Sequence, residues 1–171
     1  MNKKGQAAME FLMTYGWAIL VVLAAIGALA YFGVLSPDRF MPSKCMVSGG
    51  FSCIEFKMAK ADPTSAQTVS FYLQNNLGVD ATWLAVSLTD NDNNCTPVAD
   101  PAYTVVTVGD TIYANVTTGL TNGQKSAKLT FDGTTCVTTQ SSFRGTVTVI
   151  YLRDQEAESH TAGGSISGRF D

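Results

Sequence analysis

The sequence predicts an α+β protein, with a long hydrophobic helix at the amino terminus and an antiparallel β head after it. From Phe11 to Leu35 the chain has no charged side chain and no proline, and about 20 apolar residues suffice to span a bilayer. From Met41 onward Thr, Val, Ser, Gly, Tyr and Phe dominate, and apolar residues alternate with polar ones. That alternation is typical of half-buried strands.

The charges beside the apolar run predict its orientation. Lys3 and Lys4 precede the run, and Glu10 lies at its edge. Because basic residues stay on the cytoplasmic side, we expect the chain after Leu35 to lie outside the cell.

The predicted helix runs from about Ala7 to Leu35 and is apolar around its whole circumference. Such a helix must be surrounded by lipid or by other helices. Ala24 and Ala28 give a small-x-x-x-small spacing that allows close helix packing. Ser36-Pro37-Asp38 should end the helix, since the residue before a proline avoids the helical region.

Three fates are open to this segment. Ala28-Leu29-Ala30 fits the cleavage site of a secretory signal, but the apolar stretch before it exceeds the usual length of about 7 to 15 residues. A plain signal anchor explains the length and gives no role to Gly5, Gln6 or Glu10. The third fate is processing on the cytoplasmic side.

KKGQAAMEFL resembles the class III signal of archaeal type IV prepilins. The resemblance implies that a membrane-embedded prepilin peptidase cuts between Gly5 and Gln6, and that Glu10 takes the place of the acidic residue five positions into the mature chain. Ala8 stands where this family often has serine. We therefore expect a signal peptide over residues 1–5, a membrane and filament-core helix over 6–35, and a head over 36–171.

Glu10 has two interpretations. An acidic side chain in the first turn of a helix is stabilising by about 0.3 to 1 kcal/mol. A carboxylate entering a bilayer costs about 2.5 to 3.5 kcal/mol at the centre, which favours a charged partner. After cleavage, the new amino group of Gln6 is the expected partner, in the same chain or in a neighbouring subunit.

The head is expected to contain seven or eight short strands separated by turns rich in Gly, Asn and Asp. The candidate strands are Phe51–Met58, Thr68–Gln74, Thr82–Leu88, Tyr103–Val108, Thr111–Val116, Ala127–Phe131, Gly145–Leu152 and His160–Ile166. The candidate turns are Gly49-Gly50, Asp62-Pro63, Asn75-Asn76-Leu77-Gly78, Asp90 to Asn94, Gly109-Asp110, Asn122-Gly123 and Asp132-Gly133. This spacing suits an antiparallel immunoglobulin-like β-sandwich.

Two further stretches, CMVSGGFSCIEFKM and TVSFYLQNNLGVDATWLAVSLTD, resemble the start of the head in a group of archaeal pilins. In that group a cysteine pair brackets a tight turn, and an Asn-Asn-x-Gly turn joins two strands. The resemblance covers about the first 90 residues.

The four cysteines lie on the exported side, where disulfides persist, and four cysteines allow three connectivities. Cys45 and Cys53 flank Gly49-Gly50 and are expected to face each other across a hairpin, which leaves Cys95 to pair with Cys136. No C-x-x-C pair is present and the only histidine, His160, is remote in sequence. A zinc site is therefore disfavoured.

Two triplets, Asn94-Cys95-Thr96 and Asn115-Val116-Thr117, fit the N-glycosylation pattern. A disulfide at Cys95 would restrict access to Asn94. The acidic run Asp90 to Asn94 invites a calcium site, but it lacks the glycine and the glutamate of an EF-hand loop. We expect a solvated turn there.

Catalysis and nucleic-acid binding find little support. The chain has no G-x-S-x-G, P-loop or H-E-x-x-H motif, and His160 is expected to be an exposed strand residue. The net charge of −3 becomes −5 without Lys3 and Lys4, and the remaining basic residues are not clustered. No cofactor and no metal are expected.

These observations predict a structural protein, namely an archaeal type IV pilus subunit that polymerises through its helix into a cell-surface filament for adhesion. The resemblance implies a prepilin peptidase, a cytoplasmic assembly ATPase and a membrane platform protein as partners. Before assembly the chain would be a single-pass membrane protein with its head outside. The alternative is a membrane-anchored extracellular binding module that never polymerises.

Overall fold

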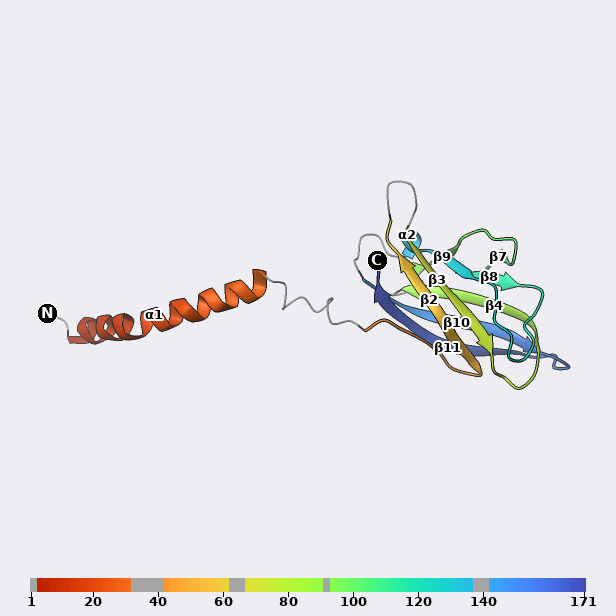
Figure 1. Ribbon diagram of the computed structural model, residues 1–171, viewed down its shortest axis with the longest axis horizontal. Helices are drawn as coiled ribbons and strands as arrows, with labels where there is room; N and C mark the ends of the chain where they lie inside the picture. Colours follow the sequence, from red (N-terminus) through yellow and green to blue (C-terminus); the bar gives the residue numbers. More distant parts are fainter. Residues whose placement is uncertain (1–2, 32–41, 62–66, 91–92, 137–141) are drawn as a thin grey trace. The chain divides into compact units, whose positions relative to one another are not determined.

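The computed structural model describes residues 3–31, 42–61, 67–90, 93–136 and 142–171 (Figure 1). The chain divides into two compact units, residues 1–40 and residues 41–171. We call the second unit the head. The expected boundary after Leu35 and the expected helix end at Ser36-Pro37-Asp38 lie outside the described residues.

One helix, α1 (Lys3–Tyr31), makes up the described part of the first unit. It has 29 residues, which at 1.5 Å per residue corresponds to about 43 Å. It begins before Ala7, where we expected the helix to start. Gly5 and Gln6 are therefore helical, because no proline interrupts the segment and Gln, Ala and Met are good helix formers.

All strand pairs in the head are antiparallel, and the larger sheet has seven strands. Six of them follow the order β1-β11-β10-β4-β8-β7, and β5 pairs with β4 off this path. Their bounds are β1 Lys44–Val47, β4 Ala81–Asp90, β5 Asn93–Asn94, β7 Thr104–Val108, β8 Thr111–Val116, β10 Ser142–Arg153 and β11 Ser159–Arg169.

The smaller sheet has four strands in the order β2-β3-β9-β6. Their bounds are β2 Phe51–Ala59, β3 Thr68–Asn75, β6 Thr96–Pro97 and β9 Leu129–Asp132. A single helical turn, α2 (Gly133–Cys136), follows β9. Figure 1 shows the strands of both sheets within the head.

Both sheets contribute side chains to one hydrophobic core. Phe71 of β3 stacks on Phe131 of β9, with ring centroids 5.7 Å apart. Phe51 of the smaller sheet meets Tyr151 of the larger one edge to face at 5.0 Å. In β10 buried and more exposed residues alternate from Phe143 to Tyr151, which is the period of a strand with one face on the core.

The hairpin expected around Gly49-Gly50 is wrong. β1 pairs with β11 in the larger sheet, whereas β2 pairs with β3 in the smaller one. Both glycines have positive φ, 72° and 89°, a conformation that glycine adopts without strain. The turn therefore carries the chain from one sheet to the other.

Other elements also depart from expectation. The strands β1, β5 and β6 were not expected, and Asp132-Gly133 leads into the helical turn α2 instead of a β-turn. At the turn expected from Asp90 to Asn94, Asp90 is buried and Asn93–Asn94 pair with β4, so only Asn93 of the described residues is exposed to solvent. Residues 91–92 lie outside the described residues. The turn expected at Asp62-Pro63 lies outside the described residues.

Candidate functional site

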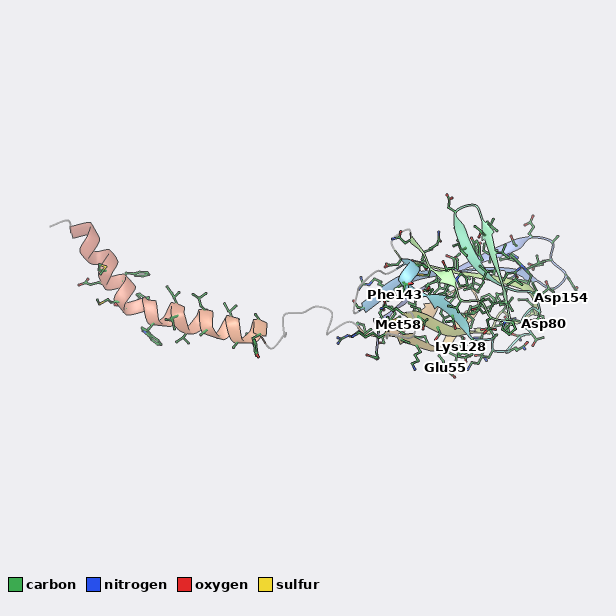
Figure 2. All side chains as sticks on the ribbon, turned by 90° about the horizontal axis from the view of Figure 1, so that it is seen from above. Glu55, Met58, Asp80, Lys128, Phe143 and Asp154 are labelled. Carbon is green, nitrogen blue, oxygen red and sulfur yellow. A yellow bond between two sulfur atoms is a disulfide. The ribbon has the colours of Figure 1, made fainter. Side chains whose placement is uncertain are left out.

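The surface of α1 is apolar and uncovered. The span Met13–Tyr31 has the length and composition of a membrane-crossing helix, and none of that window is buried. Trp17 and Leu20 each expose 68% of their surface, and Figure 2 shows the drawn side chains of the helix projecting away from it. A helix that is hydrophobic on all sides needs an apolar environment, so this unit is compatible with a single-pass membrane protein.

A shallow depression lies on one side of α1. It is bordered by Tyr15, Ala18, Ile19, Val22 and Leu23. These positions are spaced as i, i+3, i+4, i+7 and i+8 on one face of a helix. Four such residues around a small side chain form the hole that accepts a side chain of a neighbouring helix.

The amino-terminal turns carry the residues expected for processing and assembly. Gly5 and Gln6 belong to α1, and the side chains of residues 3–8 are not described. Glu10 is exposed, and the hydroxyl of Thr14 donates to its backbone carbonyl at 2.7 Å. Among the described side chains none pairs with the Glu10 carboxylate. Its charge is thus available on the helix surface.

The four cysteines form two disulfides. Cys45 is joined to Cys53, and Cys95 to Cys136, which is the pairing expected from the sequence. The first disulfide connects β1 to β2 and therefore ties the two sheets together. The second ties the segment between β5 and β6 to the end of α2. Disulfides of this kind suit an extracellular head.

The two candidate glycosylation triplets differ in accessibility. The Nδ2 of Asn94 donates to the carbonyl of Asp110, and Cys95 between Asn94 and Thr96 is fully buried in a disulfide. Asn115 lies in β8 with its side chain half-buried, and its Oδ1 is sealed from solvent and has no hydrogen-bond partner in the described parts of the chain.

An apolar hollow of about 140 Å³ lies beside Asn115 on the larger sheet. Besides Asn115 it is lined by Trp83, Ala85, Val106, Val108, Tyr113 and Ile150. These residues come from four adjacent strands, β4, β7, β8 and β10. We call this feature the outer hollow, because its residues alternate along the strands with the core residues Leu84, Val86, Ala114 and Val149.

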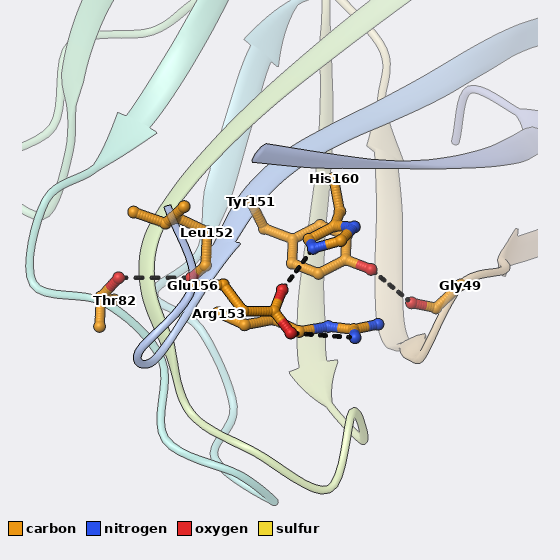
Figure 3. A network of polar contacts seen from close by, with 7 residues as sticks. All are labelled: Gly49, Thr82, Tyr151, Leu152, Arg153, Glu156 and His160. Carbon is orange, nitrogen blue, oxygen red and sulfur yellow. Dashed lines mark hydrogen bonds and ion pairs between the residues drawn. The ribbon is translucent and has the colours of Figure 1, made fainter. Parts of the chain in front are cut away.

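His160 is half-buried in β11, not exposed as expected. Its ring contacts Glu156, which also pairs with Arg153 at 3.7 Å. Figure 3 shows these groups beside Tyr151, whose hydroxyl donates to the carbonyl of Gly49 at 3.4 Å. The network closes the turn between β10 and β11 and includes no nucleophile with an adjacent base.

Burial perturbs two titratable groups in the head. Desolvation raises the pKa of Asp90 at the end of β4. Desolvation also raises the pKa of Tyr103, whose hydroxyl donates to the carbonyl of Val98 at 2.6 Å. Within the described ranges, no three His, Cys, Asp or Glu side chains gather where they could hold a metal ion.

Comparison with known proteins finds no matching family model, no matching curated protein and no matching solved structure. Sequence reasoning did not predict the outer hollow. The sequence feature that could have indicated it is a set of strands with apolar residues on both faces. Their outward positions include Trp83, Tyr113 and Ile150.

Proposed function

We propose that this chain is the structural subunit of an archaeal type IV pilus. The observation that carries the proposal is α1, a helix of 29 residues that begins with the KKG-QAAME pattern and whose apolar surface is uncovered. Such a helix is stable in lipid before assembly and among other helices afterwards, since both environments are apolar. The depression around Ala18 supports helix-to-helix packing.

Processing by prepilin peptidase between Gly5 and Gln6 would remove Lys3 and Lys4. Moving those two charges into a bundle of apolar helices would be costly, so the uncut chain remains in the membrane. Because Gly5 and Gln6 are helical, the peptidase must unwind the first turns of α1 to reach the bond. A cytoplasmic ATPase and a membrane platform protein would then drive insertion of the subunit into the filament.

Glu10 would neutralise the new amino group of Gln6 in a neighbouring subunit. Its carboxylate is exposed and has no partner among the described side chains, which supports an intermolecular role. A charge pair that becomes desolvated on assembly also selects the axial register of the helices, because any other register leaves two charges unpaired.

The head would be an immunoglobulin-like sandwich that forms the filament surface and mediates adhesion. Its two antiparallel sheets around one core and its two disulfides support this part of the proposal. In the alternative, the same head is a binding module on a permanent membrane anchor. An uncut amino terminus on surface material would favour that alternative.

Two substitutions test processing and assembly separately. Gly5→Val places a branched side chain at the scissile residue, so we expect the chain to stay uncut in cell membranes by mass spectrometry of its amino terminus. Glu10→Ala leaves the cut site intact, so we expect normal cleavage and a large loss of sheared filaments. Glu10→Asp is the matched control and should retain more filaments than Glu10→Ala.

Each outcome has its own meaning. Cleavage of Gly5→Val at the normal position would refute the class III signal and with it the pilin proposal. Normal filament yield from Glu10→Ala would reduce Glu10 to a charge near the helix end, and the pilin proposal would stand.

A further inference from the structure

The outer hollow is an exposed apolar feature with one polar residue in its wall. Ala85 lies directly across from Asn115 on one side and from Ile150 on the other, and Val106 lies across from Tyr113. Cross-strand partners share one face of a sheet. The small side chain of Ala85 between larger neighbours therefore creates the depression, and Asn115 borders it.

The Asn115 amide has no hydrogen-bond partner among the residues that the structure describes. Its Oδ1 is buried and unpartnered, although buried polar groups are normally paired. Of the two polar atoms of this amide, only Oδ1 is both buried and without a partner. An asparagine at this place thus contributes little to the fold, and a valine or threonine would suit the strand better.

The same asparagine begins an Asn-Val-Thr triplet, and Thr117 is exposed just after the end of β8. The triplet and the unpaired amide are independent observations that fall on one residue. Asn94 has the triplet but not the unpaired amide, since its Nδ2 donates to the carbonyl of Asp110. Cys95, the middle residue of that triplet, is also buried. Asn94 is therefore an internal comparison for Asn115.

We propose that Asn115 carries an N-linked saccharide whose first sugar rings cover the outer hollow. The Nδ2 of Asn115 forms a bond to the anomeric carbon of the saccharide, and the bond from that carbon to the phosphate oxygen of a lipid-linked saccharide donor breaks. Nδ2 loses one proton, and the lipid phosphate leaves with the bonding electron pair. The transfer occurs on the exported side, before or during folding of β8.

The chemistry of a sugar fits this position. One face of a pyranose presents C–H groups that pack on aromatic rings, and its rim of hydroxyls stays in water. Trp83 and Tyr113 supply half-buried rings, and Val106 and Val108 supply apolar contact. Apolar patches on exported domains promote association, and a bulky hydrophilic group attached at the edge would cover this one.

The test uses the full chain purified from membranes of the cells that make it. We expect mass spectrometry to find a saccharide on the peptide that contains Asn115. The adduct should be lost in Asn115→Gln and in Thr117→Ala, and it should persist in Thr117→Ser, which keeps the triplet. Thr96→Ala, which destroys only the triplet at Asn94, should leave it in place.

Hydroxyl-radical footprinting of the same samples tests the covering. Trp83 and Tyr113 should be labelled more strongly in Thr117→Ala than in Thr117→Ser. An unmodified Asn115 in the native chain overturns the proposal, and protection of Trp83 without an adduct would assign the hollow to another occupant, such as a free polysaccharide or a second head. If the adduct is present but the labelling of Trp83 and Tyr113 is the same in both variants, the claim that the saccharide covers the outer hollow is refuted. The inference needs export alone, so it survives a failure to form filaments.

Discussion

At the residue scale, two buried polar side chains of the head are accommodated in different ways. Asn75 is fully buried, and its Nδ2 donates to the carbonyls of Val79 and Leu120 at 2.9 and 2.8 Å. Its Oδ1 accepts from the backbone N–H of Leu77 at 2.9 Å. Asp90 is only 8% exposed, and burial raises its pKa. Asn75 therefore stabilises its turn, whereas the charge on Asp90 opposes folding.

The raised pKa of Asp90 makes the stability of the head depend on pH. Between the ordinary pKa of 3.8 and the raised folded value, the native state holds more protons than the unfolded state. The free energy of unfolding should therefore fall as pH rises through this window. Asp90→Asn removes the charge, so urea unfolding should show higher stability at neutral pH and a weaker decline across the window.

Asp110→Asn is the matched control, because Asp110 is an exposed aspartate in a turn. It should change the stability by less than about 0.5 kcal/mol, as surface substitutions usually do. If Asp90→Asn were less stable than the native chain at neutral pH, the carboxylate would be making a stabilising contact and the desolvation account would be wrong.

At the scale of elements, the two disulfides close loops of different length. Cys45 and Cys53 are 8 residues apart in sequence, and Cys95 and Cys136 are 41 apart. In the chain-entropy model a disulfide restricts the unfolded chain more when it closes a longer loop. The short disulfide connects the two sheets, so its loss also frees β1 from β2.

Replacing each cysteine pair by serine should destabilise the head unequally. The same model gives about 2.5 kcal/mol for the Cys45–Cys53 loop and about 4 kcal/mol for the Cys95–Cys136 loop. Denaturant unfolding of the two double variants measures the difference, with the native chain as control. A larger loss from the Cys45–Cys53 variant would show that the link between the sheets outweighs loop entropy.

Much of the element order could be predicted from local sequence patterns. The strands β2, β3, β4, β7, β8, β9, β10 and β11 overlap the predicted ones, because their alternation and their bordering turns are local signals. The strand β1 has only four residues, and its partner β11 lies at the far end of the chain. Local sequence patterns cannot reveal such a distant partner, so they favoured a hairpin at Gly49-Gly50 between neighbouring segments.

The candidate site was predictable to a similar degree. The apolar run of α1 follows from composition. The cysteine pairing was predicted correctly, although the hairpin assumed between Cys45 and Cys53 does not form. The outer hollow could not be predicted, because Trp83, Tyr113 and Ile150 meet only through the strand order β10-β4-β8. The sequence placed Asn115 ahead of Asn94 only through the expected disulfide at Cys95. The contacts of each amide could not be predicted, since they depend on neighbouring strands.

At the scale of the whole molecule, the two units suit different environments: the head suits water, and α1 suits an apolar environment. The head encloses its own core, whereas the apolar surface of α1 has no cover. A fragment of residues 42–171 should therefore be soluble and monomeric, with the circular dichroism of a β protein, and the full chain should require detergent. Gel filtration and circular dichroism check this. An insoluble fragment would mean that the head depends on the preceding segment.

The central claim is that the chain is cut after Gly5 and polymerises through α1. The most direct test is mass spectrometry of the amino terminus of subunits in filaments sheared from the cells. We predict that the subunits begin at Gln6 and lack Lys3 and Lys4, and that electron microscopy of the same sample shows thin filaments. Subunits that begin at Met1, recovered only from membranes and never from filaments, would contradict the claim.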